Sequence, residues 1–342
     1  MFELKVLFKN GPVACCLIHS QPAAFMRILF IGTGDIGLPS LNALLAAPQH
    51  SVVGVVTQPD KPAGRGNKLT ASSIKQRALE AGIAVHQPGR IRNYVAELAA
   101  LKPDIAIVIA YGQLLSKAVL EVPRLGCLNV HASLLPKYRG AAPIQAAIRS
   151  GDAESGVTIM HMDEGLDTGD IVLLDRLPLR PEHTGGMLHD ELAMFAPASL
   201  LHALDLIESG KAARTPQDNS LATHVGKLTR EHGRLDWTQS GAELERLVRA
   251  YNPWPGTFTT LPDAAVLKIH AAALVPHATV CPLAGTVVAA SPKQGLLIAT
   301  ADGVLELTEV QPEGKRRMPA RDFLSGHALE VGSRLGGGGP TS

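Results

Sequence analysis

The chain has 342 residues, of which 46% are hydrophobic and 18% are charged, and its formal net charge is +1. This length is typical of two domains, and the composition excludes a disordered protein. The near-zero charge excludes a protein that is basic overall, so any contact with a nucleic acid must depend on local positive patches. No run of about 18 apolar residues occurs, and we expect no membrane span.

The first 25 residues differ in character from the rest of the chain. Two lysines precede an apolar patch at 13–18, as in a signal peptide, but this patch is short and is interrupted by two cysteines. The first well-formed strand begins at Met26. We therefore expect Met26 to be the natural start and residues 1–25 to be a disordered or mis-assigned leader.

Strands alternate with helices between residue 27 and about residue 208. Hydrophobic periodicity predicts strands at 27–31, 51–57, 84–86, 105–110, 128–131, 156–162 and 170–179. It predicts helices between Gly37 and Pro48 and at 72–81, 94–101, 143–149 and 189–206. This alternation is typical of a doubly wound, mostly parallel, Rossmann-like α/β sheet, in which the strand at 170–179 is a candidate for antiparallel pairing. We expect residues 26–208 to form one domain.

The pattern changes at about residue 209. Residues 209–225 are polar and contain Gly210, Pro216 and Asp218, which is typical of a linker. A helix at 241–250 then precedes short strands at 266–271, 285–289, 295–300 and 303–310. Short strands with turn signals predict a small β-barrel over residues 226–335, followed by a flexible glycine-rich tail at 336–342.

The four cysteines are scattered and form no CxxC pair: Cys15, Cys16, Cys127 and Cys281. This usage favours a reducing compartment and argues against a zinc ribbon, so we expect a cytoplasmic protein. No cluster of ligating side chains predicts a metal site.

A glycine loop follows the first strand. Gly32, Gly34 and Gly37 have the spacing and the strand-to-helix placement of a dinucleotide-binding fingerprint, which makes a nicotinamide-dependent dehydrogenase an alternative. The acidic residue expected at the end of the second strand is missing, and Asp35 would repel a pyrophosphate. We favour a tight turn of the fold.

Two polar side chains lie at the end of one predicted strand. Asn129 and His131 are two residues apart, so they point to the same face while Val130 points into the core. The carboxyl ends of strands are the usual ligand-binding edge of an open α/β sheet. The next residues are Ser133, Leu134, Leu135 and Pro136, and the small Ala141 and Ala142 follow them. Small residues here leave room for a flat ligand.

A third element is rich in acidic residues. Asp167 lies between Gly165 and Gly169 in a segment with four acids in eight residues. The spacing does not match a calcium-binding loop. The glycines indicate a sharp turn that carries the Asp167 carboxylate to a neighbouring strand end.

With these residues the chain resembles the formyltransferases that use 10-formyltetrahydrofolate, and within them the branch that acts on methionyl-tRNA. The matching segments span residues 27 to about 325: RILFIGTGDIG, TQPDKPAGRGNKL, AYGQLLSKAVLEVPRLGCLNVHASLLPKYRGAAPIQ, SGVTIMHMDEGLDTGDIV and RAYNPWPGTF. One departure is Gly34, where many members have proline.

The resemblance implies an activity and a set of site residues. It implies transfer of a formyl group from 10-formyltetrahydrofolate, a consumed cosubstrate rather than a tightly bound cofactor, to the amino group of methionine on initiator methionyl-tRNA. It places the catalytic trio on Asn129, His131 and Asp167 and the folate contacts on Ser133, Leu134, Leu135 and Pro136. It implies a monomer with an OB-like barrel, and a tRNA-contacting loop at 59–69 that holds Lys61, Arg65 and Lys68. A second basic cluster in the barrel contains Lys315, Arg316 and Arg317.

The sequence leaves the proton assignment and the acceptor open. His131 is either the base towards the amine or the cation that stabilises an oxyanion, and Asp167 would orient it. Asn129 would donate a hydrogen bond to the oxyanion. Alternative functions are formylation of a small-molecule amine, such as glycinamide ribonucleotide or a nucleotide amino-sugar, the dehydrogenase above, and a tRNA-binding protein without catalysis.

Overall fold

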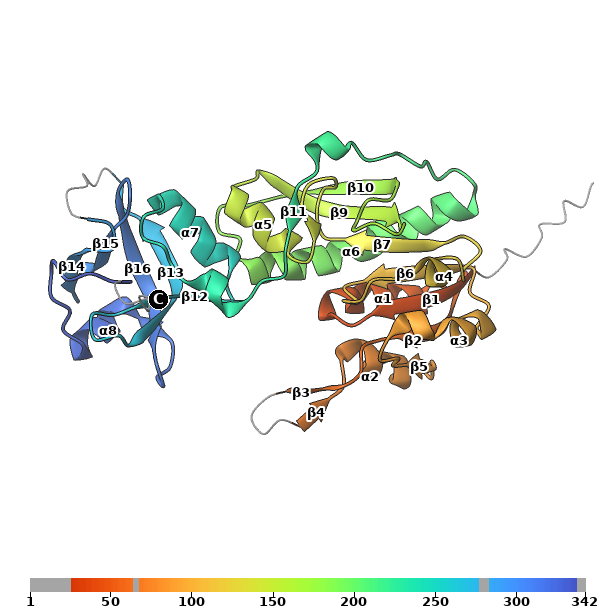
Figure 1. Cartoon of the computed structure of the whole chain (residues 1–342), viewed down its shortest axis with the longest axis horizontal. Coiled ribbons are helices and arrows are strands. Elements are labelled where there is room, and N and C mark those ends of the chain that lie inside the picture. The colour runs from red at the N-terminus through yellow and green to blue at the C-terminus, as the bar shows by residue number, and fades with distance from the viewer. Residues whose placement is uncertain (1–25, 64–67, 277–282, 337–342) are drawn as a thin grey trace, which may run out of the picture.

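The computed structural model describes residues 26–63, 68–276 and 283–336. Figure 1 shows two lobes, one built on a seven-stranded sheet and the other on a smaller six-stranded sheet. Arg65 of the predicted tRNA-contacting loop, the predicted leader and residues 337–342 of the predicted tail lie outside the described residues, as do Cys15, Cys16 and Cys281.

The first lobe contains the predicted Rossmann-like sheet, with strand order β10-β9-β7-β6-β1-β2-β5. The strands are β1 (Met26–Gly32), β2 (His50–Val56), β5 (Val85–His86), β6 (Ile105–Ile109), β7 (Cys127–His131), β9 (Glu154–His161) and β10 (Ile171–Pro178). Strands β1, β2, β5, β6 and β7 pair in parallel. Strand β10 pairs antiparallel with β9, which confirms the antiparallel pairing predicted for the strand at 170–179. Strand β9 also runs antiparallel to β7, so β9 is the strand whose direction opposes the others.

Helices cover both faces of this sheet, as the βαβ pattern predicts (Figure 1). They are α1 (Leu38–Ala46), α2 (Ser73–Glu80), α3 (Val95–Ala100), α4 (Lys117–Leu120), α5 (Pro143–Ser150) and α6 (Gly185–Glu208), with short 3-10 turns at Asp35–Gly37 and Ile91–Asn93. Helix α6 begins four residues before the predicted start because the Thr184 hydroxyl accepts a hydrogen bond from Met187 N and caps its first turn.

The glycine loop after β1 is a packing element. A Cβ atom on Gly32 would lie 2.8 Å from the carbonyl oxygen of Ile109, and one on Gly37 would lie 3.3 Å from the Ile109 side chain. The loop leads into a 3-10 turn, and the Asp35 carboxylate faces solvent beside His189. These glycines allow the loop to approach β6, as the tight-turn interpretation requires.

The second lobe is a set of antiparallel strands with α7 (Gly241–Ala250) and α8 (Ala320–Gly326) packed against them. Its main strands follow the order β12-β13-β16-β15-β14. The bounds are β12 (Thr257–Thr260), β13 (Val266–Leu274), β14 (Val287–Ser291), β15 (Gly295–Ala299), β16 (Val304–Pro312) and β17 (Met318–Pro319). Strand β12 and helix α8 were not predicted.

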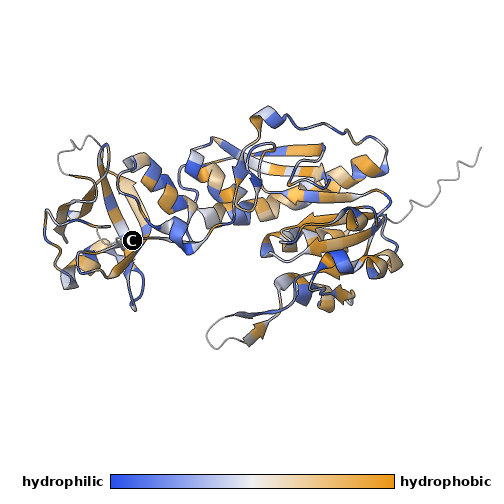
Figure 2. Cartoon of the chain, viewed as in Figure 1, coloured by the Kyte–Doolittle hydropathy of each residue, from blue (hydrophilic) through white to orange (hydrophobic). Residues whose placement is uncertain are grey.

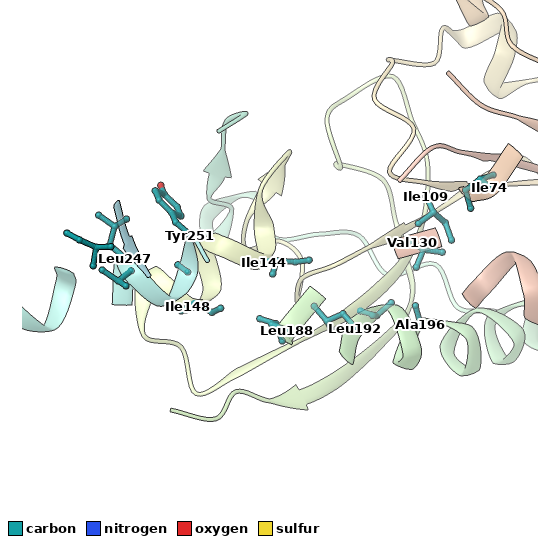
Figure 3. Packing of buried hydrophobic residues seen from close by; sticks show 14 of the residues in the cluster. Ile74, Ile109, Val130, Ile144, Ile148, Leu188, Leu192, Ala196, Leu247 and Tyr251 are labelled. Carbon is teal, nitrogen blue, oxygen red and sulfur yellow. The ribbon is translucent and has the colours of Figure 1, made fainter. Parts of the chain in front are cut away.

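Apolar side chains join the two lobes. Figure 2 shows hydrophobic residues along the strands of both sheets. Ile144 and Ile148 of α5, Leu188 of α6, and Leu247 and Tyr251 from α7 and its C-terminal end belong to one buried cluster (Figure 3). Burial of each such side chain stabilises the fold by about 1.5–3 kcal/mol, so the lobes are held by a shared core.

Two irregular segments lie near the carboxyl edge of the first sheet. The loop that the resemblance places at 59–69 contains residues of an antiparallel hairpin of β3 (Lys61–Ala63) and β4 (Lys68–Thr70). Residues 215–225, which we call the strap, run across the first lobe before the chain enters the second. The strap pairs Thr215 with Ile171, and its β11 (His224–Val225) pairs in parallel with β8 (Arg139–Gly140). The segment predicted as a linker is therefore hydrogen-bonded to the first lobe.

Candidate active site

The site is built on the carboxyl end of β7. Asn129 and His131 share one face of this strand, and Val130 belongs to the main core on the other face, as predicted. Asn129 is half-buried, and His131 is only 6% exposed. The buried strand fixes the backbone at Asn129 and His131, so both side chains have little freedom to move when a ligand binds.

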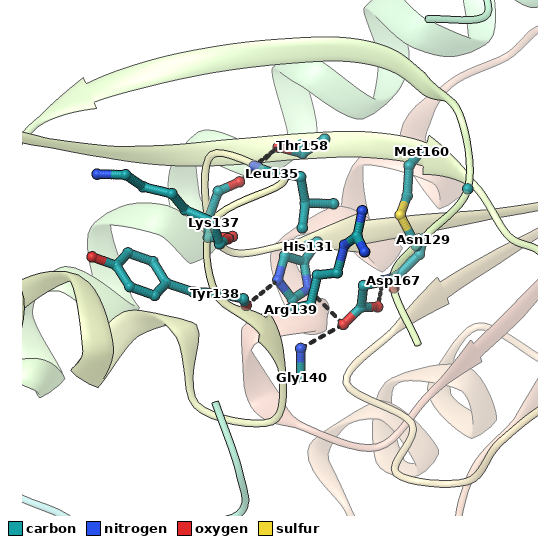
Figure 4. Close-up of polar contacts among 12 residues, drawn as sticks. Asn129, His131, Leu135, Lys137, Tyr138, Arg139, Gly140, Thr158, Met160 and Asp167 are labelled. Carbon is teal, nitrogen blue, oxygen red and sulfur yellow. Dashed lines mark hydrogen bonds and ion pairs between the residues drawn. The ribbon is translucent and has the colours of Figure 1, made fainter. Parts of the chain in front are cut away.

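The hydrogen bonds of His131 indicate which ring nitrogen exchanges a proton. Its Nε2 lies 3.0 Å from the carbonyl oxygen of Tyr138, and because a carbonyl can only accept, Nε2 donates. In the neutral ring Nδ1 then carries the lone pair. Nδ1 lies 3.7 Å from Oδ2 of Asp167, which is too long for a direct hydrogen bond but close enough to stabilise a positive ring (Figure 4).

The Asp167 carboxylate accepts two hydrogen bonds. Its Oδ2 accepts from Gly140 N at 2.7 Å and its Oδ1 accepts from Asn129 Nδ2 at 3.2 Å. Its backbone is left-handed, with φ of 54°, a conformation that costs of order 1–3 kcal/mol outside glycine. The structure thus brings the three predicted catalytic residues together, with Asp167 carried by the loop between β9 and β10 (Figure 4).

Residues of the strap hold this loop. Gln217 Nε2 donates to the carbonyl oxygens of Asp167 at 2.9 Å and Gly169 at 2.8 Å, and its Oε1 accepts from the buried Arg139. Neither Gln217 nor Arg139 was predicted as a site residue. A glutamine in a polar stretch carries no local signal, because its partners lie far away in the sequence.

The predicted folate segment forms a buried turn beside His131. Ser133 Oγ donates to Lys137 O at 2.7 Å, and Thr158 Oγ1 donates to Ser133 O at 2.6 Å. Leu135 N donates to Thr158 Oγ1 at 3.1 Å (Figure 4). Ser133 and Leu135 are buried, whereas Leu134 and Pro136 are half-buried. Any ligand contact from this turn would therefore come mainly from the apolar surfaces of Leu134 and Pro136.

A second apolar surface lies at the end of the neighbouring strand β6. Leu114 is 78% exposed in the loop after β6, whose Ala110 has a left-handed φ of 46°. Burial raises the pKa of the nearby Tyr111 hydroxyl to about 12. An exposed leucine at this edge was not predicted, because exposure of a single apolar residue has no sequence pattern.

The predicted tRNA-contacting residues lie on both lobes. Lys61 is exposed on β3, and Lys68 is in β4. Lys315, Arg316 and Arg317 are exposed between β16 and β17, and Arg317 forms an ion pair with Glu309. The structure does not cluster these residues with the catalytic trio.

Cys127 does not supply a reactive thiolate at this edge. It begins β7, and burial raises the pKa of its thiol to about 12. Within the described ranges, no three His, Cys, Asp or Glu side chains are grouped to bind a metal. No described helix is long and apolar enough to cross a membrane.

Comparisons with known proteins agree with this geometry. Residues 26–204 match the family model described as Formyl transferase, and residues 227–328 match the one described as Formyl transferase, C-terminal domain. The chain is 49% identical, over 91% of its length and 95% of the relative's, to the methionyl-tRNA formyltransferase of Symbiobacterium thermophilum. It is 51% identical, over 88% of its length and 94% of the relative's, to that of Ectopseudomonas mendocina.

Solved structures share the fold at low sequence identity. An N-formyltransferase from Helicobacter canadensis, solved with folinic acid and dTDP-3-aminofucose, is 18% identical, with a TM-score of 0.62 over 84% of this chain and 100% of that one. HypX from Aquifex aeolicus in complex with tetrahydrofolic acid is 21% identical, with a TM-score of 0.56. The match covers 88% of this chain and 47% of HypX, so this chain spans about half of that protein. The family models cover most of both lobes and overturn the dehydrogenase alternative. The chain belongs to the formyl transferase family.

Proposed function

We propose that this chain transfers the formyl group of 10-formyltetrahydrofolate to the amino group of methionine on initiator methionyl-tRNA. The product would be N-formylmethionyl-tRNA, used to initiate translation. The observation that carries the proposal is the joined set of Asn129, His131 and Asp167 at the end of β7, in a chain about half identical across its length to named methionyl-tRNA formyltransferases.

Formyl transfer needs a neutral amine, a stabilised oxyanion and a proton path. The amine attacks the formyl carbon, the carbonyl oxygen becomes negative, and the bond to the folate nitrogen then breaks as that nitrogen gains a proton. In this proposal the Nδ1 lone pair of His131 accepts the proton that the amine nitrogen loses, and the same atom returns it to the leaving nitrogen. Asp167 stabilises the imidazolium formed between these steps.

Asn129 is suited to the developing oxyanion. One N–H of its amide is used by Asp167 Oδ1, and the second N–H remains for a ligand oxygen. Because Asp167 fixes the amide, the donor is oriented before the substrate binds. Removal of one such donor typically raises the barrier by about 2.7–4 kcal/mol.

The folate cosubstrate would lie against apolar surfaces at the same edge. Leu134 and Pro136 beside His131, together with the exposed Leu114, suit a flat ring system. Gly140, Ala141 and Ala142 leave little side-chain bulk between this turn and α5.

The tRNA would contact both lobes. Lys61, Arg65 and Lys68 of the β3–β4 segment are suited to the phosphates of the acceptor arm, and Lys315 and Arg316 provide charge on the OB-like barrel. Arg317 is a weaker candidate because Glu309 already pairs with it. We also propose that the enzyme is a cytoplasmic monomer with a catalytic domain at 26–208, a connecting segment at 209–225 and a tRNA-binding domain at 226–335.

A small-molecule amine is the second candidate acceptor. The H. canadensis structure, solved with a nucleotide amino-sugar, shares the fold. The much higher identity to the tRNA enzymes, extending over the second lobe, favours the tRNA.

The test is incubation of the protein with 10-formyltetrahydrofolate and three acceptors in parallel: methionyl initiator tRNA, glycinamide ribonucleotide and a dTDP-amino-sugar. We expect formyl-methionine from the tRNA and no product from the other two. Formylation of either small amine without formylation of the tRNA would refute the proposed acceptor.

A further inference from the structure

The strap places one side chain on the loop that carries Asp167. Gln217 is 50 residues from Asp167 in the sequence, yet its Nε2 donates to Asp167 O at 2.9 Å and to Gly169 O at 2.8 Å. The amide nitrogen therefore donates to both carbonyls, and it also lies 3.8 Å from Met160 Sδ. One of these contacts is to the left-handed residue itself, whose carboxylate faces His131, and the other is to the glycine two residues later.

The other end of the same amide holds a second segment. Gln217 Oε1 accepts from Arg139 Nε at 3.1 Å and from its terminal nitrogen at 2.8 Å, and that nitrogen also donates to Asn219 Oδ1 at 2.8 Å. Arg139 is 3% exposed, and no described carboxylate forms an ion pair with it. The buried guanidinium of Arg139 is hydrogen-bonded by the neutral side-chain oxygens of Gln217 and Asn219. Loss of either oxygen would leave the buried charge without one of its partners, so the guanidinium fixes the positions of both oxygens.

The two segments meet at the Asp167 carboxylate. Arg139 precedes Gly140, whose N–H donates to Asp167 Oδ2 at 2.7 Å. Gln217 therefore contacts both the backbone of the Asp167 loop and the segment that binds the Asp167 side chain. One amide sets the relative position of the two.

Further hydrogen bonds fix the register of the strap. Thr223 O accepts from Arg139 N at 2.8 Å, and Thr223 Oγ1 accepts from Tyr138 N at 2.8 Å. Val225 O accepts from Ala141 N at 2.9 Å. The strap thus follows residues 138–141, which include the Tyr138 carbonyl that binds His131, before it enters the second lobe.

We propose that Gln217 is a positioning residue for formyl transfer, which holds Asp167 against His131 from the segment that joins the two lobes. The proposal rests on the proposed function of the trio. Misplacement of a catalytic group by about 1 Å can lower a rate about 100-fold, so loss of the two loop contacts is expected to lower turnover more than substrate binding.

The direct test compares Gln217→Glu with Gln217→Ala in the full-length protein. Glutamate keeps the length of the side chain and an oxygen for Arg139, but it cannot donate to the two loop carbonyls. We expect both variants to lose about 10- to 100-fold in kcat, while the KM for 10-formyltetrahydrofolate changes less than about threefold. Wild-type kcat in Gln217→Glu would show that the residue only satisfies Arg139 and would overturn the proposal.

A double-mutant cycle separates positioning from general damage. If Gln217 acts through Asp167, adding Gln217→Ala to Asp167→Ala changes kcat by less than about threefold, because the group it positions is gone. If the kcat losses of the two single variants multiply in the double variant, the proposal is contradicted. Gln76→Ala is the matched control, since that glutamine also donates to a backbone carbonyl, Ala71 O, on the exposed side of α2, and it should retain wild-type kinetics.

Thermal melting of each variant shows that the folded protein is being assayed. A variant that melts below the assay temperature is replaced by Gln217→Met, which keeps the length and lacks both donors, and the same loss in kcat is expected. If the wild-type protein formylates no methionyl-tRNA, the proposed function fails first. An active wild type with a fully active Gln217→Glu variant contradicts only the role of Gln217.

Discussion

The carboxylate of Asp167 lies beside the imidazole of His131, with Oδ2 3.7 Å from Nδ1. The histidine ends a buried strand, whereas the aspartate sits in a left-handed conformation in a loop. Because Nε2 of the ring donates to Tyr138 O, the lone pair of the neutral ring faces the carboxylate. At 3.7 Å the two groups do not share a direct hydrogen bond.

Asn129→Ala removes the proposed oxyanion donor. We expect kcat for formyl transfer to fall about 10²- to 10³-fold, since the lost hydrogen bond is stronger in the transition state than in the ground state. The KM for 10-formyltetrahydrofolate should change little. Steady-state kinetics with Asn42→Ala as a control, an exposed asparagine on α1, would check this. A loss confined to KM would assign Asn129 to binding.

Gly140→Ala should damage both stability and activity. A Cβ atom here would lie 2.3 Å from the carbonyl oxygen of Val225, and the backbone φ of 114° is one that alanine rarely adopts. We expect the free energy of unfolding to fall by about 1–3 kcal/mol and kcat to fall as well, because Gly140 N binds Asp167. Urea unfolding and kinetics measure the two effects. Gly89→Ala, with open space around its Cβ, is the control, and equal behaviour of the two variants would contradict the account.

We expect the β3–β4 segment to contribute to tRNA binding and not to folate binding. Lys61→Ala and Arg65→Ala should raise the KM for methionyl-tRNA. Each should also reduce the slope of log KM against log salt concentration by about the amount that one phosphate contact contributes. The KM for 10-formyltetrahydrofolate should stay unchanged. Lys117→Ala, on the surface of α4, is the charge-matched control. An unchanged salt slope in both hairpin variants would remove this segment from the tRNA interface.

His161 makes stability depend on pH. Burial, with the positive Arg214 nearby, lowers the pKa of this ring from 6.5 to about 4. Between these values the unfolded chain binds more protons than the folded protein, so the free energy of unfolding falls as the pH is lowered from 6.5 towards 4. Urea unfolding at pH 7.5, 6 and 5 should show a weaker dependence in His161→Gln than in the control His202→Gln, whose ring is exposed on α6. If the free energy of unfolding depends on pH equally in both variants, the prediction is contradicted.

The sequence predicts those features that depend on local pattern. The alternation of strands and helices predicts the Rossmann-like sheet, and the two-residue spacing of Asn129 and His131 predicts that they share a face. Periodicity identifies a strand without its direction, so the reversal of β9 was missed. The strand β12 is only four residues long and follows a proline-rich loop, which hides its signal.

The supports of the site depend on contacts between distant residues. Gln217 reaches Asp167 across 50 residues, and Thr223 Oγ1 reaches Tyr138 N across 85. A polar segment with glycine and proline predicts a linker because its composition says nothing about its partners. These contacts become visible only when the chain is folded.

The most direct test of the central claim is the single-turnover rate of formyl transfer to methionyl-tRNA by His131→Ala at saturating substrates. We expect this rate to fall about 10²- to 10⁴-fold, with the binding of tRNA and folate unchanged. A rate near that of the wild type would show that the proton does not pass through His131 and would contradict the assignment of this site.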